Sequence, residues 1–314
     1  MPNSDVPVYT AKLPMLMARD GLRVREDVLY TNAKGEDHEA SRKRAEAALL
    51  KLKDILPSVL EPNEAILYIF KCQAPLSPLE QFMLGWQAYF LTATTLVLTN
   101  LRLIHFSVDS RGNWTQTLKT VRWGDISEAK IKGWLNRMLS LKYANGKKEN
   151  YWRIQARDGK KVKDILAAVM PTSRGEGTAA QGMTSLCPDC RTLLTAGVYR
   201  CNQCGLTFRD EKTLLKWTLL VPGGGYIYAK IWFLGVIGFV FEGAFLLVTL
   251  SLALMAAGIL PTGTDQTGRR ESQADLWITT GFFLLFVALQ KLLEFHHSQR
   301  VIRNFRPLRR PGQG

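Results

Sequence analysis

The sequence predicts an α+β protein in which a β-barrel or sandwich is capped by a C-terminal helix and followed by a small metal-binding unit and a transmembrane helical hairpin. Three observations support this prediction: short β-rich runs between residues 61 and 171, two Cys-x-x-Cys pairs between 185 and 210, and apolar runs between 231 and 296. The chain has 314 residues, 46% of them hydrophobic, which excludes wholesale disorder. Its net charge of +14 indicates attraction to polyanions, either anionic lipid or nucleic acid.

Two segments precede the β-rich region. Residues 1–36 carry scattered proline and glycine without a sustained period, so we expect a flexible N-terminal arm. This arm holds no apolar run of signal-peptide length, which favours a cytosolic location for the first two thirds of the chain. Residues 37–60 are predicted to form an amphipathic helix that packs on the neighbouring domain and that Pro57 ends or kinks. Its apolar stripe consists of Ala45, Ala48, Leu49, Leu52, Ile55, Leu56 and Val59.

The β-rich region, residues 61–171, contains seven runs typical of strands, separated by polar turns. The predicted strands are Ile66–Lys71, Thr94–Thr99, Leu101–Ser107, Thr115–Val121, Ile126–Lys132, Met138–Tyr143 and Tyr151–Ala156. One helix follows, because apolar residues recur with helical spacing at Val162, Ile165, Leu166 and Val169. We expect Asn145-Gly146 to turn between two strands, Asp158-Gly159 to precede the helix and Pro171 to follow its end.

Three short motifs in this region resemble those of bacterial PH-like and GRAM-like domains. They are Glu61-Pro62-Asn63-Glu64, Leu98-Thr99-Asn100-Leu101-Arg102-Leu103-Ile104 and Trp123-Gly124-Asp125-Ile126. The resemblance covers residues 61–171 and implies a PH-like barrel or sandwich with a closing helix, which is a fold and not a reaction. Pro75–Phe90 departs from that pattern as an aromatic-rich, partly helical insertion with Phe82, Trp86, Tyr89 and Phe90. The insertion is either a partner-binding lid or extra core, and we favour extra core.

Basic residues are dense between Lys130 and Lys163, where eleven lysines and arginines accompany only Glu149 and Asp158. We expect this surface to contact anionic lipid headgroups or an acidic partner, and the alternative is a solvated strand-and-turn surface. The candidate contact residues are Lys130, Lys132, Lys147, Lys148, Lys160 and Lys161.

A cysteine-containing unit follows the β-rich region. Residues 172–184 are mostly small and are predicted to be a linker. Residues 185–210 contain two knuckles separated by ten residues, with the cysteines Cys187, Cys190, Cys201 and Cys204. Each knuckle can direct two thiolates at one tetrahedral ion, so we expect one structural zinc per chain. The unit resembles a zinc ribbon, with Gly205 fitting the family pattern and Arg191 standing where the family usually has glycine.

Other interpretations of the cysteines are less favoured. Two disulfides would need an oxidising compartment, and a thioredoxin-like redox site would need one pair on a βαβ unit. A catalytic zinc site usually has three protein ligands and an open position, whereas four thiolates close the shell. Cys72, the fifth cysteine, lies in a predicted strand and is expected to be a buried free thiol.

The last third of the chain contains two long apolar runs. Trp232–Leu260 has Glu242 as its one charged residue and exceeds the roughly 20 residues needed to span a bilayer. Leu276–Leu289 is shorter, and we expect Gln290, Lys291 and Glu294 to reach the interface and extend it to about Phe295. Residues 231–296 are therefore predicted to form a transmembrane hairpin. The acid Glu242 is expected to make a hydrogen bond within the hairpin or between protomers.

The segment before the hairpin, residues 211–230, is glycine-rich. Its Leu219–Tyr228 part is similar to the glycine-rich entry of small two-helix membrane modules found beside bacterial zinc ribbons. Pro222 and three glycines break a helix and permit either close packing or a re-entrant bend. Trp217, Tyr226 and Tyr228 suit a membrane interface.

Lysine and arginine predict the orientation of the hairpin. They flank both of its ends, whereas the connecting loop holds only Arg269 and Arg270, so both termini are expected in the cytosol at the cytoplasmic membrane. Residues 297–314 form a basic tail, predicted to contact anionic lipid through Arg300, Arg303, Arg306, Arg309 and Arg310. The alternative is a solvated tail, and His296-His297 beside it is expected to be interfacial.

The sequence favours a bacterial membrane-anchored adaptor or scaffold, not an enzyme. Its four histidines show no metalloprotease spacing, and no Ser, His and acid set suggests itself. The expected partners are the bilayer, an unidentified protein and anionic lipid, with self-association as a further option. The alternative function is a membrane-tethered nucleic-acid-binding regulator. The nearly uncharged segment Thr192–Tyr199 between the knuckles argues against that alternative.

Overall fold

The computed structural model describes residues 22–308 except 33, 78–79, 83–84, 135–136, 173–176, 179 and 262–271. Residues 1–21 of the predicted arm, the loop arginines Arg269 and Arg270, and the tail arginines Arg309 and Arg310 lie outside this description. The chain divides into two compact units, one spanning Met1–Leu206 with Arg309–Gly314 and the other spanning Thr207–Leu308. Each unit is described separately.

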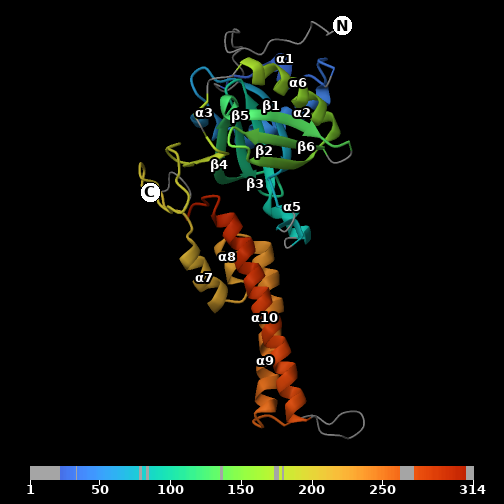
Figure 1. Cartoon of the computed structure of the whole chain (residues 1–314), viewed down its shortest axis with the longest axis vertical. Helices are drawn as coiled ribbons and strands as arrows, with labels where there is room; N and C mark the ends of the chain where they lie inside the picture. Colours follow the sequence, from blue (N-terminus) through green and yellow to red (C-terminus); the bar gives the residue numbers. More distant parts are fainter. Residues whose placement is uncertain are drawn as a thin grey trace. The chain divides into compact units, whose positions relative to one another are not determined.

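The first unit is an α+β fold built on one eight-stranded antiparallel sheet, drawn in blue to yellow-green in Figure 1. Its strands are β1 (Ile66–Gln73), β2 (Ala93–Thr99), β3 (Arg102–Val108), β4 (Trp114–Arg122), β5 (Ile126–Lys132), β6 (Arg137–Tyr143), β7 (Lys148–Ile154) and β8 (Thr184–Leu186). They are ordered β5-β6-β7-β1-β2-β3-β4-β8. Strands β1 and β7 pair only at Gln73 and Trp152, so the sheet opens between them toward the start of β1.

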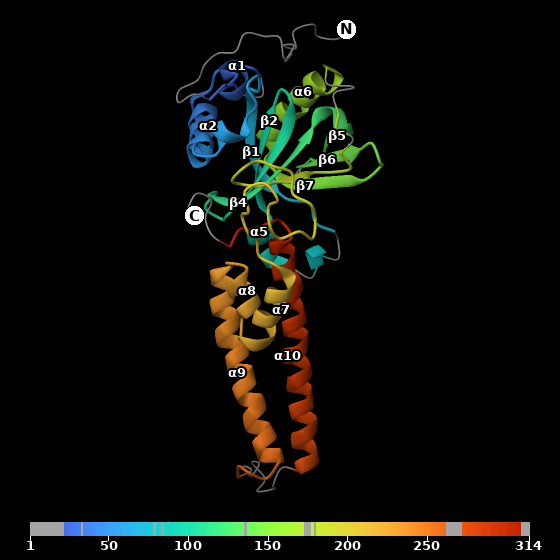
Figure 2. The same ribbon diagram turned by 90° about the vertical axis from the view of Figure 1, so that its left-hand side faces the viewer.

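Alternating residues of the strands feed two hydrophobic cores. Along β2, Leu96 and Leu98 enter one core and Val97 enters the other, as the two-residue period of a strand requires. The first core is closed by helix α6 (Ala156–Thr172) through Val162, Ile165, Leu166 and Val169. The second is closed by α1 (Glu26–Leu29), α2 (Glu39–Leu52) and α3 (Leu56–Val59). Figure 2 shows α1 and α2 to one side of strands β1 and β2 and α6 to the other.

The predicted apolar stripe before the sheet packs on the second core, with Ala45 and Leu52 buried on α2. Pro57 was expected to end or kink this helix, but α2 already ends at Leu52 and Pro57 lies in the first turn of α3, where proline is tolerated because its missing N–H has no helical partner. In the sheet, Asn145-Gly146 forms the predicted turn between β6 and β7, with φ +81° at Gly146.

The start and end of α6 differ from prediction. Asp158 and Gly159 were expected before the helix but lie in its first turn, and Pro171 lies inside its last turn. A Cβ on Gly159 would stand 2.5 Å from Cδ of Arg137, so glycine at this position leaves room for the Arg137 side chain against the start of α6. Close packing, rather than turn geometry, therefore accounts for Gly159.

The insertion between β1 and β2 is partly helical, with a 3₁₀ helix at Gly85–Gln87 and α5 at Ala88–Leu91. Phe82 is 86% exposed, Tyr89 51% and Phe90 41%, so the interpretation of these aromatics as extra core is wrong. They form an exposed aromatic surface, with the Arg153 guanidinium 5.3 Å from the Tyr89 ring centre.

The eighth strand was not predicted. β8 pairs with β4 through Leu118–Leu186, Lys119–Ser185 and Thr120–Thr184 and leads directly into Cys187. The segment between α6 and β8 donates hydrogen bonds to the buried carboxylate of Asp125. The donors are Thr178 N (2.6 Å), Thr178 Oγ1 (2.8 Å) and Ala180 N (3.1 Å). The segment before β8 is thus bound to the corner between β4 and β5.

The second unit is helical. It consists of α7 (Glu211–Leu220), α8 (Gly224–Tyr228), α9 (Trp232–Ala256) and α10 (Gln273–Ile302), drawn in orange to red in Figure 1. Helices α9 and α10 are long and apolar enough to cross a membrane, with mean hydropathies of 2.2 and 1.8 over their most apolar stretches. Large apolar side chains on both are exposed, among them Leu247, Ile278 and Phe282.

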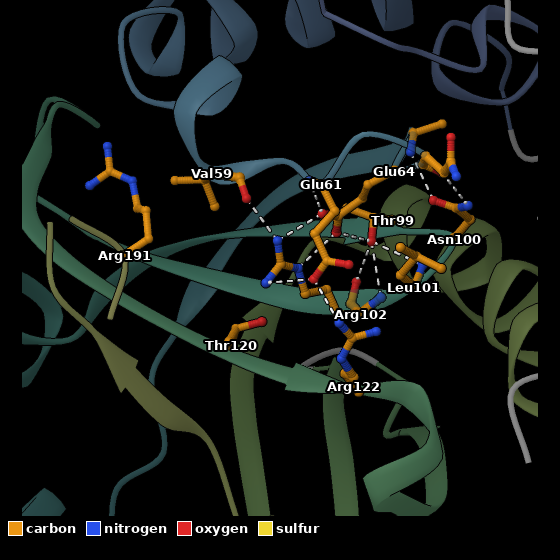
Figure 3. Close-up of polar contacts among 12 residues, drawn as sticks. Val59, Glu61, Glu64, Thr99, Asn100, Leu101, Arg102, Thr120, Arg122 and Arg191 are labelled. Atoms are coloured by element: carbon orange, nitrogen blue, oxygen red, sulfur yellow. Dashed lines mark hydrogen bonds and ion pairs between the residues drawn. The ribbon is translucent and has the colours of Figure 1, made fainter. Parts of the chain in front are cut away.

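A buried ion pair joins the first two sequence motifs of the first unit (Figure 3), and a hydrogen bond links the third motif to them. The Arg102 guanidinium donates to both carboxylate oxygens of Glu64 at 2.9 and 2.8 Å, and Glu64 is fully buried. Arg102 also donates to Val59 O at 2.7 Å, at the end of α3. Thr99 Oγ1 lies 2.7 Å from Glu64, and Trp123 Nε1 donates to Thr99 O at 2.9 Å. The motifs are distant in sequence but form one polar cluster, here called the Glu64 cluster.

We predict that Glu64→Ala lowers the free energy of unfolding of the first unit by about 3–5 kcal/mol, because the buried Arg102 loses both of its close carboxylate contacts and keeps only the longer one to Glu61 at 3.6 Å. Glu61→Ala is the matched control, since Glu61 also pairs with Arg102 and Arg122 but keeps 35% of its side chain exposed. Its loss should stay under about 1 kcal/mol. Hydrogen exchange of β2 and β3 in the detergent-solubilised chain measures both effects. Equal losses in the two variants would show that Glu64 has no special role.

Candidate metal centre and the helical unit

Four cysteines of the first unit converge on one point. The Sγ atoms of Cys187, Cys190, Cys201 and Cys204 all lie within 4.8 Å of one another. Cys187 and Cys204 are 3.6 Å apart, and Cys190 and Cys201 are 3.5 Å apart. Tetrahedral Zn–S bonds of about 2.3 Å place sulfurs roughly 3.8 Å apart, whereas a disulfide needs about 2.05 Å. The four thiols are free of disulfides and are arranged as a set that can bind a metal ion.

The two knuckles have the same backbone pattern. Cys187 N donates to Thr192 O at 2.8 Å and Cys201 N donates to Leu206 O at 2.8 Å. Four residues after each first cysteine, a backbone N–H returns to that cysteine's carbonyl, from Arg191 and Gly205, both at 3.0 Å. This repeat turns both cysteines of each pair toward the same point.

Arg191 occupies the position that Gly205 occupies in the second knuckle. Both take left-handed backbone conformations, with φ +65° at Arg191 and +74° at Gly205. Arginine has a steric cost there that glycine lacks. The Arg191 guanidinium also donates to Ser58 Oγ at 2.5 Å and to Ser58 O at 3.3 Å. Arg191 therefore links the first knuckle to α3 by hydrogen bonds.

Burial differs among the four thiols. Cys187 and Cys201 are buried, Cys190 is half-buried and Cys204 is exposed. Burial raises the pKa of the Cys187 thiol well above its usual range. Burial also opposes ionisation of Cys190, but hydrogen bonds with Thr192 and neighbouring thiols outweigh it and lower the pKa of Cys190 to about 6. A bound cation would favour the thiolate form at all four positions, so metal binding releases protons.

We predict that the purified chain carries one metal ion and that Cys187→Ser removes it. Serine cannot replace a thiolate ligand, and a unit of this size has little core of its own, so residues 187–204 should lose hydrogen-exchange protection. Elemental analysis and exchange measure the two effects. Cys72→Ser is the control, because Cys72 is buried but outside the cluster, and it should keep its metal. Retention of the ion in Cys187→Ser would contradict the assignment.

In the helical unit, the glycine-rich segment permits close packing. Gly223 has φ +63° and precedes α8, and a Cβ there would clash with Gly235 O on α9. A Cβ on Gly224 would clash with Trp217 O, and one on Gly225 would stand 2.6 Å from Thr218 Oγ1. The three glycines thus let α8 approach α7 and α9 at backbone distance.

Glu242 is paired inside the helical unit, as predicted. Its Oε2 accepts from Gly223 N at 2.9 Å, and its Oε1 lies 2.5 Å from Lys291 Nζ. Lys291 Nζ also lies 3.6 Å from Glu294 Oε2 and donates to Val221 O at 2.9 Å. Glu294 Oε1 accepts from Gly225 N at 2.6 Å. One lysine and two carboxylates therefore bind the glycine-rich segment to both long helices.

The residues that surround Glu242 are largely buried. Lys291 and Glu294 were expected to reach the membrane interface, and within the helical unit their side chains are only 14% and 2% exposed. His297, also expected to be interfacial, is buried, with Nδ1 2.8 Å from Tyr226 Oη. The position of these three residues relative to a membrane stays a prediction. Lys291 lies about five turns along α10.

The basic residues predicted to contact lipid differ in exposure and in their partners. Lys130, Lys132, Lys147, Lys148 and Lys160 are exposed, whereas Lys161 is buried. Lys130 pairs with Glu128, and Lys147 pairs with Glu149 at 3.1 Å. In the tail, Arg303 binds Glu211 at 2.7 Å.

The apolar residues of the tail are packed within the helical unit. Ile302 and Phe305 are buried, with the Phe305 ring 5.5 Å from that of Phe208. Leu308 N donates to Thr207 O at 3.0 Å, and Arg209 N donates to Arg306 O at 3.0 Å. The two ends of this unit are thus joined to each other.

Comparison with protein-family models, with curated proteins and with solved structures returns no match for this chain.

We predict that Lys291→Met destabilises the helical unit by about 3 kcal/mol, because it leaves the buried carboxylates of Glu242 and Glu294 without their cation. Adding Glu242→Gln should recover part of this loss, which a double-mutant cycle measures. Lys216→Met on α7 is the control, since Lys216 is exposed. Thermal unfolding in detergent provides the readout. Additive losses for the two substitutions would mean that the ion pair contributes nothing.

Proposed function

We propose that this chain is a membrane-anchored adaptor that presents a PH-like domain and a zinc ribbon in the cytosol and binds protein or anionic lipid there. The observation that carries the proposal is the combination, in one chain, of an α+β unit with a four-cysteine centre and a helical unit with two membrane-length apolar helices. The first suits recognition and the second suits anchoring. No catalytic role is proposed.

The PH-like assignment is supported by strand order and by the motif residues. Strands β1 to β7 are antiparallel and are followed by α6, which closes one core. The three motifs of the family resemblance meet in the Glu64 cluster, where they act structurally. A four-thiolate set supports zinc, because closed tetrahedral thiolate sites are typical of structural zinc.

Membrane anchoring is supported by the exposed apolar faces of α9 and α10 and by the pairing of Glu242 with Lys291. A paired intramembrane charge is tolerated, whereas an isolated one is costly. A cytosolic first unit is supported by the four free thiols, since a reducing compartment keeps thiolates available to metal.

The non-enzymatic part of the proposal is supported by His105, the histidine within the sheet. It is buried, with Nδ1 3.1 Å from Tyr151 Oη. Burial, with a smaller effect of Lys119, lowers the pKa of His105 to about 3. Such an imidazole is a weak base near neutral pH and is suited to packing.

We predict that reporter fusions after residues 210 and 314 lie on the cytosolic side and that a fusion within residues 262–271 lies on the opposite side. The chain should also stay in the membrane pellet after an alkaline wash. Opposite locations for the first two fusions would eliminate the second span, and release by the wash would eliminate anchoring.

The adaptor role is tested by crosslinking intact membranes and purifying the full chain with and without nuclease. An adaptor should retain protein or lipid partners after nuclease treatment. The alternative regulator should instead bring down nucleic acid whose recovery falls steeply with salt. Loss of every partner on nuclease treatment would favour that alternative.

A further inference from the structure

A cavity of about 700 Å³ lies in the first unit beside the open seam between β1 and β7. It is lined by the connection from α1 to α2, one face of α2, the middle of β1, and the start of α6. Its volume falls within the range of small-molecule sites. Among the predicted lipid-contact residues that the structure describes, Lys161 is the one that lines it.

Its charge is strongly one-sided. The described lining residues include six cations, Lys34, Arg44, Lys51, Lys71, Arg157 and Lys161, and one acid, Asp158. Asp158 is already engaged, since Tyr68 Oη donates to it at 2.9 Å and Arg157 Nε lies 4.0 Å away. The cavity therefore carries excess positive charge that the side chains lining it do not neutralise.

Helix α2 leaves room between its cations. Ala40, Ala47 and Ala48 line the cavity with methyl groups, and Arg44 and Lys51 lie seven residues apart. Seven residues span about 10.5 Å along a helix. This spacing suits a ligand with a compact anionic group and leaves space for the remainder of the molecule.

Two ammonium groups converge at one edge of the cavity. A Cβ on Gly112 would lie 3.1 Å from Lys51 Nζ and 3.2 Å from Lys71 Nζ. Lys51 Nζ donates to Arg111 O, whereas the side-chain ammonium of Lys71 has no hydrogen bond or ion pair among the described residues. Like charges held this close repel, and an anion between them would reverse the sign of the interaction.

A third ammonium is buried in the cavity wall. Lys161 is only 6% exposed, and its Nζ lies 4.7 Å from the Tyr68 ring centre and 3.1 Å from Thr31 Oγ1. Within the described residues it has no carboxylate at salt-bridge distance. Its Nζ also donates to the backbone carbonyls of Thr31 and Leu29, so its partners are neutral acceptors. Burial lowers the pKa of Lys161 to about 8, against the opposing effect of Asp158. An anion in the cavity would add a direct opposite charge.

Phosphate matches these donors better than a carboxylate does. A phosphomonoester carries nearly two charges and three strong acceptor oxygens, so it can bind cations from several elements at once. Here α2, β1 and α6 each contribute cations. A bounded cavity of this volume also fits a headgroup or small molecule better than an extended acidic peptide.

We propose that this cavity binds a phosphomonoester, carried either by a lipid headgroup or by a soluble molecule. If a lipid headgroup carries the phosphomonoester, the inference rests on the proposed function and names the ligand class of the adaptor. If a soluble molecule carries it, the inference does not require a lipid-binding adaptor.

The test uses the full chain in phosphatidylcholine nanodiscs. Inorganic pyrophosphate is titrated by calorimetry, and a second preparation contains phosphatidic acid in the nanodisc, with hydrogen exchange of α2 and β1 as its readout. Arg44→Gln/Lys71→Gln alters two exposed cavity residues, and Lys130→Gln/Lys132→Gln removes the same charge from exposed positions on β5.

The cavity variant should bind pyrophosphate at least about ten-fold more weakly, because it loses two charge-assisted contacts, while the β5 variant stays within about two-fold. Pyrophosphate binding without a response to phosphatidic acid supports a soluble ligand, and protection by phosphatidic acid supports a headgroup. The proposal is overturned if neither probe binds, if both variants lose affinity equally, or if only a polyglutamate peptide binds. Failure of the topology experiment leaves the pyrophosphate result unaffected, so the two ideas can fail separately.

Discussion

The buried carboxylate of Glu64 holds together parts of the α+β unit that are far apart in sequence. Its two oxygens are bound by Arg102, which also bonds the carbonyl at the end of α3, and Thr99 links the same group to Trp123. A charge buried this deeply must stay paired, so the start of β1, the turn between β2 and β3, and the corner after β4 are fixed together. The same arrangement holds the end of α3, the helix that follows α2 in the chain.

The helical unit uses the same chemistry. Glu242 accepts a backbone N–H from Gly223 and pairs with Lys291, as Glu64 accepts the N–H of Glu61 at 2.9 Å and pairs with Arg102. In both units a buried carboxylate accepts a hydrogen bond from a backbone N–H that lies outside the regular hydrogen bonding of the helices and strands, and one cation offsets its charge. Glycine at positions 223–225 is what lets the backbone come close enough in the second unit.

Most of the secondary structure and the four candidate metal ligands could be predicted from local patterns in the sequence. Strands β1 to β7 were predicted from short β-rich runs between polar turns, and the convergence of the four cysteines was predicted from the spacing of their two pairs. Features made by distant residues could not be predicted: β8 has three residues and no alternation of its own, and the partners of Glu242 and Glu64 lie on other elements. Burial of Phe82, Tyr89 and Phe90 was expected from their hydrophobicity, yet an insertion at the end of a seam has little to pack against. The cavity combines single cations from segments up to about 130 residues apart, which no local pattern reports.

The position of β8 gives the cysteine unit a second consequence. β8 lies at the outer edge of the sheet, and one side of it pairs with β4. Its other side pairs with the residues that follow the first knuckle, through the Leu186–Leu193 β-bridge and a hydrogen bond from Leu194 N to Ser185 O at 2.9 Å. Exposed strand edges are templates for pairing between chains, and proteins cover them. Here the cover is a loop whose shape depends on four thiolates held together. A metal ion held by these four thiolates would therefore also keep this sheet edge covered and would oppose edge-to-edge association of the sheet.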